Sequence, residues 1–391
     1  MTLELVPLGS YVRVIGGYAF PSESYADEGI PVIRISDIQD GMVSAKKAAK
    51  IPDEMVGKGR NYQVEPGDIL IAMSGATTGK IGVVADDFNG PYLQNQRVGN
   101  FRINDAKKVD KVYLRHYLTS PNYQKQLRNL MAGAAQPNIS SKQLESIELP
   151  LPPLPEQKRI AAILDKADSI RRKRQEAVRL TEELLRSVFL EMFGDPVMNP
   201  KGWDVRKFED IGSLDRGVSK HRPRNAMELL GGSYPLIQTG DVSNSDGYIR
   251  SYKSTYSEIG LKQSKMWPAG TLCITIAANI AKTGILTFDS CFPDSVVGFS
   301  PNAHATTEYV QFWLGFLQKI LEDSAPESAQ KNINLEILRN LDIPLPPVKL
   351  QTKFSEQVKN LHKLKAKQST GVNFTDTLFS SLLQRAFKGE L

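Results

Sequence analysis

Four adjacent polar residues, Gln94, Asn95, Gln96 and Arg97, present amide and guanidinium groups one after another. Groups of these kinds form paired hydrogen bonds with the edges of DNA bases, so the run is a candidate for sequence readout. The same side chains could instead bond to the backbone at a strand edge, and this structural role is the alternative.

A glycine-rich loop with the sequence SGATTGK spans residues 74–80. Glycine lets a backbone approach a phosphate closely, and the lysine would supply a counter-charge. The loop is not a nucleotide P-loop, because only three residues separate its glycines and Ile81 stands where Ser or Thr should follow the lysine. We interpret it as a candidate DNA contact through Ser74, Thr77, Thr78 and Lys80.

The second half of the chain offers its own polar loops. The stretch SKHRPRN, residues 219–225, is basic and could meet phosphates, although a solvated loop is an equal alternative. AANIAKTG, from residue 277, occupies the place that the glycine-rich loop has in the first half. The candidate contact residues of the second half are Lys220, Arg222, Arg224, Gln238, Thr239, Asn279 and Lys282.

No catalytic constellation is present in the sequence. NGPY, residues 89–92, has the outline of an adenine methyltransferase tetrad but lacks its central proline and an upstream cofactor motif, and PDEMVGK, residues 52–58, is an isolated nuclease-like group. The four histidines lack metal-ligand spacing, and Cys273 and Cys291 are interpreted as reduced, packed thiols, with a disulfide as the alternative. We expect no cofactor and no metal in this chain, so that any chemistry belongs to partners.

These candidate residues lie in a duplicated chain. AAQPNISSKQLESIELPLPP, from Ala134, matches SAQKNINLEILRNLDIPLPP, from Ser328, at an offset of 194. IPVIRISDI, from Ile30, matches YPLIQTGDV, from Tyr234, and two further blocks follow in the same order. The recurrence of AQPN as AQKN argues for a shared turn or cap there rather than for specificity.

Each repeat is predicted to fold as a mixed α and β globule. PVIRISDI, GDILIAM and KIGVVAD are apolar or alternating runs bounded by turn residues, as strands are. Residues 111–129 have the spacing of a helix. We expect an α+β fold with two similar domains in tandem.

A proline-rich hinge follows each globule and leads into a long helix. Residues 156–193 contain no glycine or proline and carry apolar residues near a heptad spacing, and Gly194 with a following proline ends them. The second copy runs from about residue 350 to 387, with Gly371 weakening its middle. One apolar stripe needs a partner, so we expect the two helices to pack antiparallel, with pseudo-two-fold symmetry and the globules at opposite ends. The expected domains are 1–150 and 196–343, and the expected hinge-and-helix segments are 151–195 and 344–391.

Composition and charge set further limits. With 391 residues, 41% of them hydrophobic, two or three domains are expected, and no apolar stretch is long enough for a membrane span. The net charge is +6, yet residues 1–155 hold 17 Lys and Arg against 16 Asp and Glu, and residues 193–348 hold 15 against 17. The excess lies on the two helical segments, where the RRKR run at 171–174 would point around the whole helix rather than form one patch. We expect a cytoplasmic protein whose globules alone bind DNA weakly.

The hinge PLPPLPEQKRIAAILDKAD, the helix end FLEMFGDP and the terminal LLQRAFKGEL resemble the specificity subunit of type I restriction-modification enzymes. The resemblance covers essentially the whole chain. It implies a non-catalytic subunit whose two target-recognition domains each read one half of a bipartite sequence in double-stranded DNA. It further implies docking of two adenine methyltransferase subunits, which use S-adenosylmethionine, and of restriction and translocase subunits, which use ATP with Mg. The second hinge departs from the first in reading VKLQTKF instead of LPEQKRI, which predicts unequal docking surfaces.

The duplication and the resemblance agree on the predicted target. Related domains suit the related strands of a duplex, and because the interiors of the repeats differ, we predict an asymmetric, interrupted site. Two alternatives remain at this point: a diverged DNA methyltransferase or nuclease, and a coiled-coil scaffold that binds only proteins.

Overall fold

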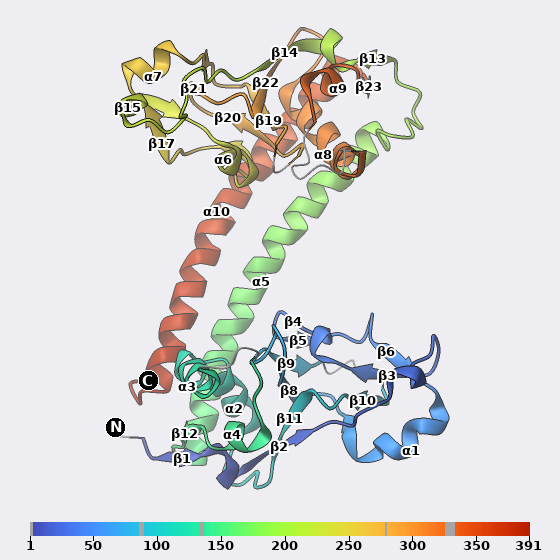
Figure 1. Cartoon of the computed structure of the whole chain (residues 1–391), viewed down its shortest axis with the longest axis vertical. Coiled ribbons are helices and arrows are strands. Elements are labelled where there is room, and N and C mark those ends of the chain that lie inside the picture. Colours follow the sequence, from blue (N-terminus) through green and yellow to red (C-terminus); the bar gives the residue numbers. More distant parts are fainter. Residues whose placement is uncertain (1–2, 86–89, 133–136, 278–279, 325–332) are drawn as a thin grey trace. The chain divides into compact units, whose positions relative to one another are not determined.

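The computed structural model describes residues 3–85, 90–132, 137–277, 280–324 and 333–391. Contacts between residues divide the chain into two compact units. Unit 1 comprises residues 1–175 and 370–391, and unit 2 comprises residues 176–369. Figure 1 labels most of the elements that are described below.

Unit 1 is built on three sheets among its described residues. The largest has the strand order β2 (Val12–Gly16), β11 (Val98–Ile103), β8 (Ile69–Ala72), β9 (Ile81–Val84), β5 (Met42–Val43), β4 (Ile38–Gln39). The second has the order β6 (Ala49–Ile51), β3 (Ile30–Ile33), β10 (Tyr92–Gln94), β7 (Gln63–Val64), and the third pairs β1 (Leu5–Pro7) with β12 (Glu148–Pro150). Short helices α1 (Val56–Gly59), α2 (Lys111–Leu118), α3 (Pro121–Met131) and α4 (Ser141–Glu145) complete this part.

Unit 2 repeats this arrangement. Its largest sheet has the order β14 (Gly212–Arg216), β22 (Val296–Pro301), β19 (Leu272–Thr275), β20 (Thr283–Leu286), β16 (Gly247–Ile249). The second has the order β17 (Ser254–Tyr256), β15 (Leu230–Leu236), β21 (Ser290–Cys291), β18 (Met266–Trp267), and β13 (Val205–Lys207) pairs with β23 (Asp342–Pro344). Its helices are α6 (Thr239–Ser243), α7 (Glu258–Lys262), α8 (Thr307–Ser324) and α9 (Leu335–Arg339).

An equivalent set of hydrogen bonds stabilises each unit from within. In unit 1, the amide of Asp110 donates to Gln157 Oε1 (2.9 Å), and in unit 2 the amide of Thr306 donates to Gln351 Oε1 (2.9 Å). Both glutamines are fully buried, and each Nε2 donates to a hinge carbonyl and to a second carbonyl. The shared strand order and these shared bonds confirm the internal duplication.

The tyrosines and the Asp caps repeat as well. Tyr113 donates to the carbonyl of Pro150, and Tyr309 donates to that of Pro344. Each hinge is therefore bonded to the first turn of a helix in its own unit, α2 in unit 1 and α8 in unit 2. The carboxylates of Asp37 and Asp241 each accept from a backbone amide three residues earlier (2.8 and 2.9 Å). This is the pair that the sequence alignment placed at corresponding positions.

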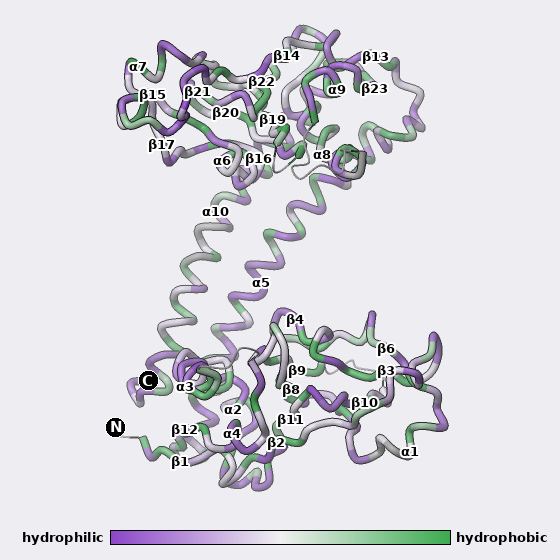
Figure 2. The backbone as a smooth tube through the Cα atoms, viewed as in Figure 1, coloured by the Kyte–Doolittle hydropathy of each residue, from purple (hydrophilic) through white to green (hydrophobic). Residues whose placement is uncertain are grey.

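The two long helices are α5 (Leu154–Phe193) and α10 (Val348–Ala386), and each one passes from one unit into the other. In unit 1 their segments run antiparallel, because Arg159 bonds to Leu391 while Arg171 lies 3.8 Å from Asp376. In unit 2 they do so too, since Thr181 bonds to Gln368 while Phe193 packs on Phe354. Hydrophobic residues recur among hydrophilic ones along both helices (Figure 2).

Two expectations about helices need correction. Gly371 does not interrupt α10, which is continuous; a Cβ at this glycine would lie 2.3 Å from Nη1 of Arg174, so the missing side chain leaves room for that arginine. The predicted helix over residues 111–129 is instead two helices, because Ser120 caps α3 with Pro121 at its first turn.

Each unit has its own core, to which the long helices contribute. In unit 1, Ile160 and Leu164 of α5 pack with Leu383, Ala386 and Phe387 near the end of the chain. In unit 2, Phe189, Phe193 and Phe354 pack with residues of α8 and the large sheet. Cys273 and Cys291 are buried free thiols, as predicted, and none of the described helices has the length and apolar character needed to cross a membrane.

Candidate nucleic-acid interface

The glycine-rich loop joins β8 to β9 in unit 1 and is tightly folded. Thr78 Oγ1 donates to the carbonyls of Gly75 (2.7 Å) and Pro137 (2.8 Å), so this candidate side chain holds the loop rather than pointing away from it. Gly75 and Gly79 both have positive φ values, which favour glycine. The hydroxyls of Ser74 and Thr77 are buried without a hydrogen-bond partner among the described residues, and Lys80 is exposed at the end of the loop.

Of the four polar residues at 94–97, the first two are buried or half-buried and the last two are exposed. Gln94 is 1% exposed, and its Nε2 donates to the carbonyls of Ile15 and Val98, so it takes the structural role that the sequence left open. Asn95 is half-buried and accepts from the amide of Arg97 (3.2 Å). Gln96 and Arg97 are exposed in the turn between β10 and β11, and the described residues offer no hydrogen bond or ion pair to either side chain.

The turn and the glycine-rich loop share one hollow of about 950 Å³. The amide of Met73 donates to the carbonyl of Arg97 (2.8 Å), which ties the turn to the end of β8. Ser74 pairs with Asn138 in an isolated β-bridge, and Asn138 and Ser140, just before α4, also line the hollow. Ser74, Gln96 and Arg97, which were predicted separately, therefore lie around one concave polar surface.

In unit 2 the basic loop is held by an acid. Arg224 Nη2 lies 2.6 Å from Asp294 Oδ1, and Arg222 Nη2 lies 3.6 Å from Asp294 Oδ2. Nη1 of Arg222 also donates to the carbonyls of Ser219 and His221, which shapes the loop itself. Lys220 is exposed, and its side chain has no bonding partner within the described ranges.

The remaining candidates of unit 2 differ in their exposure. Gln238 is exposed at the start of α6, and Thr239 is half-buried in its first turn. Lys282 is exposed with Nζ 3.4 Å from Gln318 Oε1, and Asn279 lies outside the described residues.

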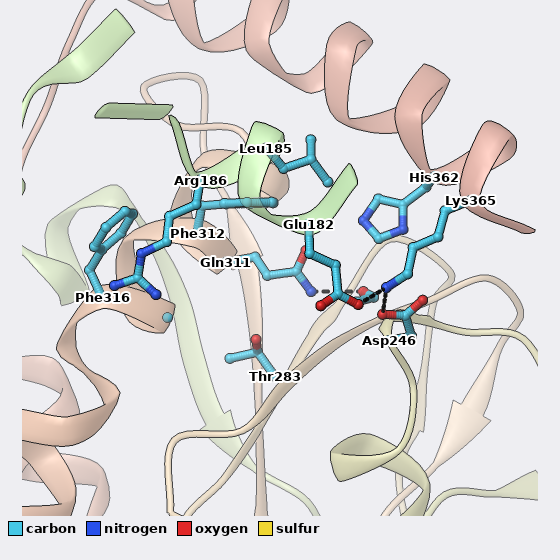
Figure 3. A pocket seen from close by; sticks show the side chains of 12 residues that line it. Glu182, Leu185, Arg186, Asp246, Thr283, Gln311, Phe312, Phe316, His362 and Lys365 are labelled. Atoms are coloured by element: carbon cyan, nitrogen blue, oxygen red, sulfur yellow. Dashed lines mark hydrogen bonds and ion pairs between the residues drawn. The ribbon is translucent and has the colours of Figure 1, made fainter. Parts of the chain in front are cut away.

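Unit 2 also has a smaller hollow, of about 300 Å³, where α5, α8 and α10 meet the sheet (Figure 3). Lys365 is 5% exposed and bridges the carboxylates of Glu182 and Asp246. His362 beside it is buried, and burial holds the pKa of its imidazole below its ordinary value. Gln311 donates to the carbonyl of Gly247 (2.7 Å), and these contacts fix the loop before β16 to the helices.

The corresponding place in unit 1 is built from other side chains. Arg171 lies 2.7 Å from Asp168 and over the ring of Phe379, and Arg172 also pairs with Asp168. His116 is buried against Asp165 (2.7 Å), and burial lowers its pKa although that hydrogen bond opposes the shift. Two arginines of the RRKR run are thus committed to ion pairs within the unit rather than to one basic patch.

Sequence reasoning missed two contributors to these surfaces. Asn138 was assigned to a shared cap, yet it faces the large hollow of unit 1; its match in the second repeat, Asn332, lies outside the described residues. Asp294 was not singled out, because its role depends on arginines that are 70 and more residues away in the chain. Across the described residues, no group of three or more His, Cys, Asp or Glu side chains could hold a metal ion.

The chain belongs to the family described as the type I restriction modification DNA specificity domain, whose model matches residues 2–180 and 200–373. The two matches confirm a pair of tandem recognition domains in a mixed α+β fold. The chain is accordingly a DNA specificity subunit of a type I restriction-modification system, which is a non-catalytic role.

Particular relatives support this assignment. The EcoBI specificity subunit of Escherichia coli is 26% identical, with 99% of this chain and 85% of that protein covered. The EcoKI specificity subunit of Escherichia coli strain K12 is 22% identical, with 99% and 89% covered. The crystal structure of the S subunit from M. genitalium shares the fold, with a TM-score of 0.63 at 14% identity over 99% of this chain and 96% of that one.

A second solved structure comes from work on complex assembly and conformational transition of the type I R-M system. It aligns with a TM-score of 0.52 at 20% identity, covering 100% of this chain and 98% of that chain. Membership of this family places the chain in a type I restriction-modification complex.

Proposed function

We propose that this subunit reads an asymmetric, bipartite DNA sequence, with one half-site read by each unit. The observation that carries the proposal is that the units share a buried hydrogen-bonded frame and differ at their exposed turns. Gln157 and Gln351 make the same bonds, whereas Gln96 and Arg97 in unit 1 are matched by Asp294 and Ser295 in unit 2. A common frame with different polar edges suits the reading of two different half-sites.

The proposed partners are two adenine methyltransferase subunits and, where present, restriction and translocase subunits. Long helices with exposed apolar side chains support docking of proteins, because such side chains gain from removal from water. The exposed apolar residues of α5 and α10 are Ile170, Leu180, Leu184, Leu190, Val348, Leu364, Phe374 and Leu378. S-adenosylmethionine, and ATP with Mg for restriction, would be used by these partners rather than by this chain.

The near-neutral recognition units support a further part of the proposal. Affinity for the phosphate backbone comes from net positive charge, and neither unit concentrates such charge on its globule. We expect the purified chain to bind DNA weakly and the methyltransferase partners to close around the duplex. Tight, salt-resistant and sequence-specific binding by the chain alone in a filter-binding titration would contradict this.

A methylome tests the proposed function directly. The chain is expressed with its cognate methyltransferase subunit in a host without DNA methylation, and N6-methyladenine is mapped by single-molecule sequencing. We expect a bipartite, asymmetric motif that appears only with this chain, and of which one half changes when residues 1–150 are exchanged for those of a relative. A stable complex that methylates nothing would favour a protein-binding scaffold instead.

A further inference from the structure

We infer that corresponding turns of the two units each place one arginine for the reading of guanine. Arg97 lies in the turn of unit 1, and in unit 2 Asp294 of the turn holds Arg224 of the neighbouring loop. The inference rests on the proposed function and assigns the readout to particular side chains. It also moves Arg224 from a phosphate contact, which the basic loop suggested, to a base contact.

The two turns occupy the same place in their units. The amide of Gly17 donates to the carbonyl of Val98 (3.2 Å), and the amide of Gly217 donates to that of Val296 (2.9 Å). A Cβ at Gly17 would lie 2.1 Å from the carbonyl oxygen of Gln94, and one at Gly217 would lie 2.3 Å from that of Phe292. The close approach of these glycines fixes residues 95–97 and 293–295 as equivalent turns.

In unit 1 the turn itself carries the guanidinium group. Arg97 is exposed at the rim of the large hollow, and its side chain bonds to nothing in the described part of the chain. Guanine presents two acceptors, O6 and N7, in the major groove, and an arginine can bond to both. Gln96 and Asn138 flank Arg97 with amide groups, which suit a neighbouring adenine.

In unit 2 the turn carries an acid, and the guanidinium group comes from the neighbouring loop. A lone carboxylate here would repel both the phosphates and the base acceptors. Asp294 Oδ2 instead accepts one hydrogen of Nη2 of Arg224 (2.9 Å), with Oδ1 2.6 Å from the same nitrogen. The second hydrogen of Nη2 then forms a donor edge with its neighbour, Nε or Nη1, and neither of these two nitrogens has a partner among the described residues. Arg222 already donates to two backbone carbonyls. Arg224 is therefore the arginine of this loop that is available to bond to a base.

The clamp has a consequence for the strength of the readout. An arginine that is already held in one conformation loses less side-chain freedom when it binds. Asp294 is therefore a positioning residue, and the guanine position of unit 2 should be read more strictly than that of unit 1, where no acid holds Arg97.

The test uses the complex of this chain with its methyltransferase subunit and compares methylomes of R97K and R224K. Lysine keeps the positive charge but cannot bond to O6 and N7 as a fork. We expect each variant to lose about 10-fold or more of its preference for guanine at one position of one half-site, with the other half-site unchanged. K220A is the matched control, because Lys220 is exposed in the same loop as Arg224 and should lower overall methylation without altering the motif.

D294N tests the positioning role. We expect it to relax the same position as R224K, and the double variant to relax that position no further. A merely structural role would lower methylation at all sites and leave the motif as strict as before.

Binding measurements keep the inference open to refutation if a variant abolishes methylation. The purified parent complex should bind a duplex with 7-deazaguanine, which lacks the N7 acceptor, about 10-fold more weakly at each assigned position, and the lysine variants should show a smaller difference between the two duplexes. A parent motif without guanine in either half, or strict motifs in both lysine variants, would overturn the inference while leaving the proposed function intact. A parent complex that directs no methylation would contradict the proposed function itself.

Discussion

The two units of this subunit share a buried hydrogen-bonded frame and differ at corresponding turns. Gln157 and Gln351 make the same three kinds of hydrogen bond, and the strand orders of the sheets match. The turns at 95–97 and 293–295 share their backbone and carry unrelated side chains. The comparison indicates that the folding of each unit and, in the proposed function, the reading of its half-site depend on separate residues.

The largest effect is expected where the units are alike. Q157A and Q351A each leave buried amides and carbonyls without a partner and should lower the free energy of unfolding of their own unit by about 3 kcal/mol. Hydrogen exchange at the amides of Asp110 and Thr306 would locate the loss in one unit at a time. Q384A, at an exposed glutamine of α10, is the control and should change little. Unequal effects of the two variants would mean that the frames are not equivalent.

Substitutions where the long helices meet the globules should lower the free energy of unfolding by less, and by different amounts in the two units. K365A removes a buried cation from between Glu182 and Asp246 and should cost about 2 kcal/mol. R171A, at the corresponding place in unit 1, removes a more exposed arginine and should cost about 1 kcal/mol. Chemical unfolding of both variants, with K363A at an exposed lysine of α10 as control, checks the order. A larger loss from R171A would reverse the comparison.

Acidification should weaken both units through one buried histidine each. Burial lowers the pKa of His116 and of His362 in the folded chain, so the unfolded chain binds more protons as pH falls below the ordinary value of about 6.5. Stability should therefore be intact at pH 7.5 and decline through pH 6 to 5.

Thermal unfolding of H116N and H362N between pH 5 and 7.5 provides the measurement. Each variant should lose part of the pH dependence of the parent chain. An unchanged profile in both would show that the buried imidazoles do not control the acid response.

The smallest effect is expected at the helix glycines. G371A gains helix propensity of up to about 1 kcal/mol but must displace the flexible end of Arg174, so its net gain should be below that. G315A in α8 meets nothing within 4 Å and should gain the full amount. Calorimetry on both variants would decide, and a loss of stability in G371A would show that Arg174 cannot move.

Much of the fold could be predicted from the sequence. The duplication, the strands of each unit and the two long helices follow from repeats, punctuation and the absence of glycine and proline over residues 156–193. The two hinges differ in sequence, yet Gln157 and Gln351, which are 194 residues apart, form equivalent hydrogen bonds. The glutamine is retained in both repeats although its neighbours have changed, and this retention indicates a shared hydrogen bond. The signal is visible only when the repeats are aligned.

The contact surfaces could be predicted only in part. Exposure of Arg97 followed from its turn, whereas the burial of Gln94 depends on carbonyls of two other strands. The clamp on Arg224 depends on Asp294, which sequence distance conceals. Which side chain faces solvent and which is held is decided by long-range pairing, and local residue patterns do not encode it.

The passage of each long helix between the units has a consequence for synthesis of the chain. Residues 176–369 are all present before the last 22 residues are made, so unit 2 is the first whose sequence is complete. Unit 1 starts first but needs Leu383, Ala386 and Phe387 to close its core. The core of unit 1 is therefore complete only after residues 370–391 have been made, although its first residues are the first to be synthesised.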